Sequence, residues 1–169
     1  IDTINRKLIQ GCTTTKLPEG VRCLGAYSFA GFTNLANINS LLEGVELIGE
    51  GAFAGCTGLT NLTIPESVKY VCARAFIGCT GLESVVVNDG LKSLPKSLFL
   101  GCTKLMSIKI PASVTKINSK AIPVRTTNNV TIYGVTDSVA HTFAKSNSCP
   151  FVDYTVVSTP AENIVIKED

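Results

Sequence analysis

Seven cysteines and one histidine are the side chains of this 169-residue chain with the widest range of chemistry. The cysteines stand at positions 12, 23, 56, 72, 79, 102 and 149. An odd number cannot pair completely, and no two lie within five residues of each other, so the close cysteine pairs of zinc ribbons and redox motifs are missing. Cys56, Cys79 and Cys102 recur at equal intervals along the chain, which fits a disulfide ladder, a metal site or packed thiols.

Packing is the best explanation for this column of three cysteines. Equivalent Cα atoms in stacked repeats lie about 4.8 Å apart, which is within the range of a disulfide, so distance does not exclude a bond. However, Phe32 fills the same position one unit earlier, and a position that accepts Phe is apolar and buried. Free cysteine behaves as a small hydrophobic residue. No histidine or carboxylate shares the column, which argues against a metal site.

The other four cysteines are placed less regularly. Cys12 falls in the apolar position of the first unit, and Cys23 and Cys72 are candidates for partial exposure. Cys149, beside Pro150, is the best candidate for a reactive thiol, although packing is the stronger expectation there as well.

Nothing else in the sequence forms a catalytic set. His141 falls on the side of a predicted helix away from Phe143, so we expect it to be solvated. A single histidine does not assemble a convincing Ser-His-Asp or Cys-His site. The acidic residues are scattered, and the glycines belong to repeated turns rather than to a phosphate-binding loop. We therefore predict no catalytic residue, no cofactor and no metal, and expect that the chain is not an enzyme.

The composition excludes two further classes of protein. Charged residues make up 17% of the chain and the net charge is +2, which argues against a nucleic-acid binder that relies on a basic face. No apolar run approaches the roughly 20 residues that cross a bilayer. The length suits one domain, which we expect to be monomeric. Because the chain starts at Ile1 without Met, we expect a mature fragment or an excised domain.

An internal repeat organises most of the sequence. Phe29, Phe53, Phe76, Phe99 and Ile122 follow one another at steps of about 23 residues, of which only the first is one residue longer than the rest. Other apolar columns keep the same phase, for example Leu35, Leu59, Leu82 and Leu105. This period lies in the leucine-rich repeat range of about 20–29 residues. Each unit holds a short alternating segment such as "LTNLTIP", which predicts a strand closed by proline.

The repeat unit resembles one particular family. Its pattern, F-x-G-C-T-x-L-x-x-I-x-I-P-x-x-V-x-x-I, is seen in "FAGCTGLTNLTIP" and "FLGCTKLMSIKIP", with the cysteine before the strand. This resembles the BspA-like leucine-rich repeat family of bacterial surface antigens and some parasitic protists. The resemblance covers nearly the whole chain, although Asn88 replaces the proline and "NSLLEG" carries an extra residue and lacks the proline. It implies an extracellular or cell-surface protein that adheres to host or neighbouring-cell proteins.

The predicted fold is a leucine-rich repeat solenoid, α/β-type or mostly β. We expect a parallel sheet on the concave side, short irregular or 3₁₀ turns on the convex side, and a C-terminal cap of one helix and one strand. The expected boundaries are a first unit over 1–28, repeats over 29–122 and a cap over 123–154. Residues 155–169 are expected to be a linker rather than an added edge strand.

The cap has its own sequence signals. Asp137 is predicted to cap a helix over about 138–146, and Asn147 fits its C-terminal end. An apolar stripe on this helix would cover the last coil; it consists of Val139, Ala140, Phe143 and Ala144. The segment "PFVDY" is predicted to be a final strand.

The outward face of the predicted sheet is the candidate binding surface. Its residues are short, polar and almost uncharged, and Tyr133 is the one aromatic candidate for an anchor. We predict one outward row of Thr14, Asn37, Asn61, Ser84, Ser107 and Asn129. We predict a second row of Lys16, Asn39, Thr63, Val86, Lys109 and Thr131. Two glycosylation sequons, at Asn61 and Asn129, fall on this face and have meaning only in a eukaryotic secretory pathway.

Three functions fit these observations. The first is a non-catalytic protein-binding or adhesion module that acts through the polar sheet face. The second is a rigid spacer, in which case the polarity of the face only reflects its exposure to solvent. The third is an accessory domain of a larger surface protein or hydrolase.

Overall fold

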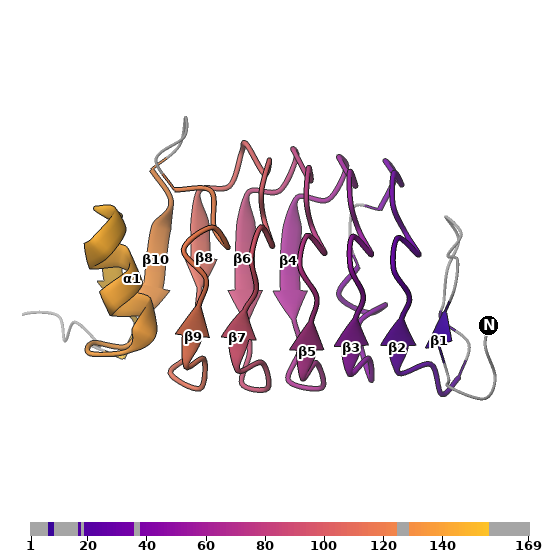
Figure 1. Cartoon of the computed structure of the whole chain (residues 1–169), viewed down its shortest axis with the longest axis horizontal. Coiled ribbons are helices and arrows are strands. Elements are labelled where there is room, and N and C mark those ends of the chain that lie inside the picture. The colour runs from indigo at the N-terminus through magenta and orange to yellow at the C-terminus, as the bar shows by residue number, and fades with distance from the viewer. Residues whose placement is uncertain (1–6, 9–16, 18, 36–37, 125–128, 156–169) are drawn as a thin grey trace, which may run out of the picture.

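In the computed structural model, the chain forms a stack of coils that runs from right to left in Figure 1. A helix closes the C-terminal end of the stack. The structure describes residues 7–8, 17, 19–35, 38–124 and 129–155. Each complete coil contains one longer strand, which points downward in Figure 1, and one two-residue strand, which points upward. The parallel-sheet solenoid expected from the repeat period is confirmed.

The longer strands form a five-stranded parallel sheet, which we call the long ladder. Its order is β11-β10-β8-β6-β4. The strands are β4 (Asn61–Ile64), β6 (Ser84–Val87), β8 (Ser107–Lys109), β10 (Thr131–Gly134) and β11 (Phe151–Asp153). In β4, Leu62 and Ile64 are buried while Asn61 and Thr63 face outward, as the alternating sequence predicts. The predicted final strand is confirmed as β11.

A second set of strands lies on the other side of each coil, where only irregular turns were predicted. These are β1 (Lys7–Leu8), β2 (Cys23–Leu24), β3 (Leu47–Ile48), β5 (Tyr70–Val71), β7 (Ser93–Leu94) and β9 (Lys116–Ile117). They form two parallel sheets, β1-β2-β3-β5 and β7-β9. Strands of two residues carry too little alternation for the sequence to reveal them.

Pro95 accounts for the break between these two sheets. After each short strand, a backbone N–H donates to the coil before it: Gly49 to Leu24 O at 3.0 Å, Cys72 to Ile48 O at 2.9 Å and Asn118 to Leu94 O at 3.0 Å. Residue 95 holds the same position in its own coil, but proline has no N–H to donate. The ladder therefore stops between β5 and β7.

The third side of each coil is a tight turn that brings a phenylalanine into the core. Hydrogen bonds from residue i+3 to residue i close these turns, as from Cys79 N to Phe76 O at 3.4 Å, and none of the described turns extends into a 3₁₀ helix. Gly101 has φ +80°, and a Cβ there would lie 3.3 Å from the Cα of Gly78 in the preceding coil. Glycine is needed here because the turns stack closely and the backbone is left-handed.

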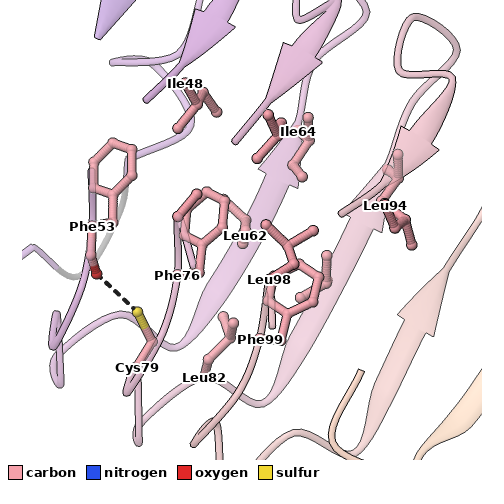
Figure 2. Close-up of a cluster of buried hydrophobic side chains, with 14 of the residues drawn as sticks. Ile48, Phe53, Leu62, Ile64, Phe76, Cys79, Leu82, Leu94, Leu98 and Phe99 are labelled. Atoms are coloured by element: carbon pink, nitrogen blue, oxygen red, sulfur yellow. Dashed lines mark hydrogen bonds between the residues drawn. The ribbon is translucent and has the colours of Figure 1, made fainter. Parts of the chain in front are cut away.

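The phenylalanines stack through the centre of the solenoid. Phe29, Phe53, Phe76 and Phe99 are fully buried, and their ring centroids lie 5.3, 5.3 and 5.7 Å apart. Figure 2 shows Phe53, Phe76 and Phe99 in this row, with Leu62 and Leu82 packed beside them. Phe53 and Phe76 each pack against the rings of the coils before and after them, so no single coil completes the core.

The cysteine column lies against the phenylalanine row and contains free thiols. Cys56, Cys79 and Cys102 are at most 1% exposed. Each Sγ–H donates to a phenylalanine carbonyl of the coil before it, at 3.1 Å for Cys56 to Phe29, 3.1 Å for Cys79 to Phe53 and 3.3 Å for Cys102 to Phe76. The dashed line in Figure 2 marks the bond of Cys79. The prediction of packed, reduced thiols is confirmed for these three residues.

Burial suppresses ionisation of these thiols. It raises the pKa of Cys56 to about 12, with a further contribution from Cys79. The pKa of Cys79 is raised as well, by hydrogen bonding with the Cys102 side chain and by burial. Cys23 and Cys72 are partly exposed, as expected. Cys149 is half-buried and packs against the core, the stronger expectation for it, and Cys12 lies outside the described residues.

The cap helix differs from its prediction by one residue. Helix α1 spans Val139–Asn147, and its N-cap is Ser138, whose Oγ accepts from His141 N, rather than Asp137. Asp137 is one position too early and adopts φ +62°. Ser148, in a left-handed conformation, is the C-cap, so Asn147 ends the helix as expected. Ala140, Phe143 and Ala144 are buried, but Val139 is only half-buried.

His141 is not the solvated residue that the sequence predicted. Its ring stacks on Phe151 of β11, with centroids 4.6 Å apart, and its side chain is half-buried. Its Nδ1 accepts a hydrogen bond from Asp137 N at 3.1 Å. The helical spacing correctly predicted that His141 points away from Phe143. It could not reveal that β11 lies on that side of the helix.

The phenylalanine stack predicts the stability of a core variant. Phe76→Ala should lower the free energy of unfolding by about 3–5 kcal/mol, because it removes a ring that packs on both neighbours. Phe76→Leu, which refills most of the space, should cost less. Urea denaturation followed by circular dichroism measures both, and a loss below about 1 kcal/mol for Phe76→Ala would contradict this stacked core.

The thiol column predicts a pattern of alkylation. In the native protein, iodoacetamide should modify Cys72 and Cys149 much faster than Cys56, Cys79 and Cys102, and peptide mass spectrometry measures the rates. The pKa of Cys56 is higher in the folded protein than in the unfolded protein. The buried neutral thiol therefore contributes its full stabilisation below about pH 8.5, and this contribution is lost as the pH rises through the folded pKa of about 12. Urea-unfolded protein is the control. Equal rates for all five thiols before unfolding would refute the buried column.

Candidate functional site: the outward face of the long ladder

The long ladder presents its alternate side chains to solvent in two rows, which together we call the long-strand face. Strand pairing places Asn61, Ser84, Ser107 and Thr131 in the first row. It places Thr63, Val86, Lys109 and Tyr133 in the second row. Asn61 and Lys109 are exposed and the other six are half-buried. All eight belong to the surface predicted from the sequence.

The ends of both rows differ from the prediction. Ser107 pairs with Thr131, not with Asn129, and Lys109 pairs with Tyr133, not with Thr131. Asn129 is exposed but precedes β10, so it lies outside the rows. The sequence misled here because the last step, from Ser107 to Thr131, is one residue longer than the step before it, and the segment between them no longer follows the repeat. Thr14, Lys16 and Asn37 lie outside the described residues.

Asn39 has a structural role at the N-terminal edge of this face. Its Oδ1 accepts a hydrogen bond at 2.9 Å from the backbone N–H of Thr63. The Asn39 side chain thus satisfies the backbone N–H of Thr63, which would otherwise pair with a neighbouring strand. This happens in the coil that the extra residue of "NSLLEG" disturbs. The long ladder therefore begins at β4, and the half-buried Asn39 borders it.

Hydrogen bonds between side chains fix the polar part of the face. Ser84 Oγ donates to Asn61 Oδ1 at 2.6 Å, and Asn61 Nδ2 donates to Thr60 Oγ1 at 3.1 Å. These contacts orient the Asn61 amide, which lowers the entropy that it would lose on binding.

The C-terminal end of the face carries aromatic and cationic groups that the sequence prediction did not combine. Val152 of β11 pairs with Tyr133 and extends the second row, and it is 42% exposed. Lys109 Nζ lies 4.4 Å from the centroid of the Tyr154 ring, in a cation–π contact. Tyr133, Lys109, Val152 and Tyr154 form what we call the aromatic end. The alternation within "PFVDY" could have revealed Val152 and Tyr154, because they share one side of the strand while Phe151 and Asp153 share the other.

Asp153 anchors the chain at the aromatic end. Its carboxylate accepts hydrogen bonds from Thr136 N at 2.8 Å and from Thr155 N at 2.8 Å, and from both threonine hydroxyls. These bonds, with those from the hydroxyls contributing most, hold the pKa of Asp153 well below its usual range. Tyr154 lies between Asp153 and Thr155 in the chain, so these hydrogen bonds fix it beside Lys109. Burial, followed by the charges of Asp89 and Asp153, raises the pKa of Tyr154.

The long-strand face presents hydroxyl, amide, aromatic and ammonium groups. Within the described residues, no three His, Cys, Asp or Glu side chains are placed to hold a metal ion. None of the described helices is long and apolar enough to cross a membrane. Two open pockets, of about 730 and 440 Å³, lie off this face. The larger one is at the N-terminal turns around Val21, Leu41 and Ser67, and the smaller one adjoins Lys96 and Lys120.

Solved structures with a similar fold are bacterial leucine-rich repeat proteins. The pneumococcal vaccine antigen PcpA matches 88% of this chain with 18% identity and a TM-score of 0.61. A leucine-rich cell surface protein of Faecalibacterium prausnitzii matches 90% with 21% identity and a TM-score of 0.53. The leucine-rich repeat protein TpLRR of T. pallidum matches 60% with 29% identity and a TM-score of 0.51. The matches cover 44%, 36% and 47% of those chains, respectively.

The family assignment rests on the repeats themselves. A comparison with curated protein sequences found no match. The profile of the BspA-type leucine-rich repeat region, however, matches residues 2–122 in six copies. These residues include the phenylalanine and cysteine columns that build the core. The chain therefore belongs to the BspA-type leucine-rich repeat family.

Proposed function

We propose that this chain is a non-catalytic binding module of a secreted or cell-surface protein, which adheres to a host or neighbouring-cell protein through the long-strand face. The observation that carries the proposal is the aromatic end, where Tyr133, Lys109 and Tyr154 stand at the end of a polar face. Tyrosine is enriched among the residues that dominate binding energy, and polar surroundings exclude water from such anchors.

The surroundings of the aromatic end support binding by a preformed surface. The five strands of the long ladder share one core, and Asp153 holds the segment that carries Tyr154. A surface that is already ordered loses little entropy when it binds. The similar fold of cell-surface proteins supports an extracellular or cell-surface location. We expect the module to act as a monomer.

The alternative is a rigid spacer or an accessory domain of a larger surface protein or hydrolase. The stacked core supports this alternative as well, because a continuous row of buried rings makes a stiff rod. The two functions differ in one respect. A spacer needs only polar residues on the long-strand face, so it would tolerate loss of the aromatic end.

Substitution at the aromatic end tests the proposal. The double variant Tyr133→Ser with Tyr154→Ser should weaken binding to a purified matrix or plasma protein at least tenfold, because truncation of an anchor typically costs about 2 kcal/mol or more. Biolayer interferometry against a panel of immobilised matrix and plasma proteins measures this effect. The matched control is Tyr27→Ser, which removes an exposed tyrosine from a turn outside the long-strand face and should leave binding unchanged.

Two outcomes would contradict the proposal. One is the absence of saturable binding to any protein of the panel or to intact host cells. The other is binding that the double variant retains while its thermal midpoint stays that of the native protein. Either result would favour the spacer.

A further inference from the structure

The short strands present a second surface, on the side of the coils away from the long-strand face, and its charges are unevenly distributed. In the coils nearest the N-terminus the charges are paired: Arg22 with Glu46, and Arg74 with Glu50, whose atoms lie 3.0 Å apart. In the last two coils, the exposed residues Lys92, Lys96, Lys116 and Lys120 make no ion pair with any described residue.

The repeat period groups these four lysines. Ser93 of β7 pairs with Lys116 of β9, so Lys92, one residue before Ser93, is a diagonal neighbour of Lys116 in the adjacent coil, and the two coils lie about 4.8 Å apart in the ladder direction. Lys96 and Lys120 are related in the same way, four residues further along each coil. Four residues span at most about 14 Å, so the four exposed lysines belong to one stretch of the surface over two adjacent coils.

Among the described residues, no acidic side chain forms an ion pair with these four lysines. Asp89, three residues before Lys92, is exposed and forms no ion pair with a described residue. Glu50, which occupies the position of Lys96 two coils earlier, is paired with Arg74.

An exposed aromatic ring adjoins the lysines. Tyr70 of β5 holds the position in its coil that Ser93 and Lys116 hold in theirs, and it is 70% exposed, more than any other large apolar side chain described. Among these residues, Ser93, Thr115 and Ser119 are exposed and provide hydroxyl groups. Lys96 and Lys120 also border the open pocket of about 440 Å³.

We propose that Tyr70 and the four lysines form a binding strip for an acidic polysaccharide, one that carries sulfate or carboxylate groups. The ammonium groups neutralise the anions, the hydroxyl groups bond to those of the sugar, and the Tyr70 ring packs against the apolar face of one sugar ring. A nucleic acid fits less well. A single strand requires a series of stacking aromatics, and a duplex requires neutralisation of more phosphates than four lysines reach.

The strip is separate from the surface of the proposed function, so the two can fail independently. The probe is heparin, with unsulfated dextran as the neutral control, in isothermal titration calorimetry on the whole chain. Heparin should bind at about 150 mM NaCl and weaken steeply as salt rises, since binding releases counterions. Dextran should not bind.

Matched variants assign the binding to the strip. Lys116→Gln with Lys120→Gln should raise the Kd for heparin at least tenfold. Lys104→Gln with Lys145→Gln removes the same charge from exposed positions elsewhere and should change the Kd less than twofold. Tyr70→Ser should weaken binding severalfold, whereas Tyr70→Phe, which keeps the ring, should not. Circular dichroism confirms that each variant is folded.

Four results would overturn the proposal. The first is no heparin binding at physiological salt, and the second is an equal loss in both lysine variants. The third is a Tyr70→Ser variant that binds as the native protein does, because the strip would then be a nonspecific cationic surface. The fourth is equally tight binding of duplex DNA or of poly-glutamate, because the strip would then prefer another class of anion.

Discussion

The contact between successive coils is the interaction on which the rest of this structure depends. One coil is too small to enclose its own apolar side chains, so Phe53 and Phe76 are each buried by the rings on either side. The same contact satisfies the backbone, because the N–H groups of one coil donate to carbonyl groups of its neighbour on two sides of the solenoid. The cysteine thiols add hydrogen bonds in the same direction.

This repeated contact explains which features the sequence could predict. The apolar columns specify the strands β4, β6 and β8 and their register, because a slip of one residue would turn Leu62 or Val85 out of the core. Phe32, in the cysteine column, likewise indicated that the thiols are buried. The two sheets of short strands were missed because two-residue strands leave no periodic signal. The choice of Asp137 over Ser138 as the N-cap failed because two adjacent residues both have suitable side chains.

The candidate site was predictable only where the repeat holds. The outward residues from Asn61 to Lys109 follow directly from the period, whereas Asn129 and Thr131 were placed two residues out of register. The aromatic end combines Lys109 of the repeat with Tyr133 and Tyr154 of the cap, and the cap follows different rules because it must close the core. The proposed anchor therefore lies where sequence periodicity carries the least information. The coils also carry two unlike surfaces, one polar with an aromatic end and one with unpaired lysines.

The register of β10 tests this account most directly, because it brings Tyr133 and Tyr154 to Lys109. Paired residues of neighbouring strands lie about 4.8 Å apart at Cα, close enough for a disulfide. The variant Ser107→Cys with Thr131→Cys should therefore oxidise to an internal disulfide, identified by peptide mass spectrometry. The variant Ser107→Cys with Asn129→Cys should not. A disulfide in the second variant but not in the first would contradict the register and, with it, the aromatic end.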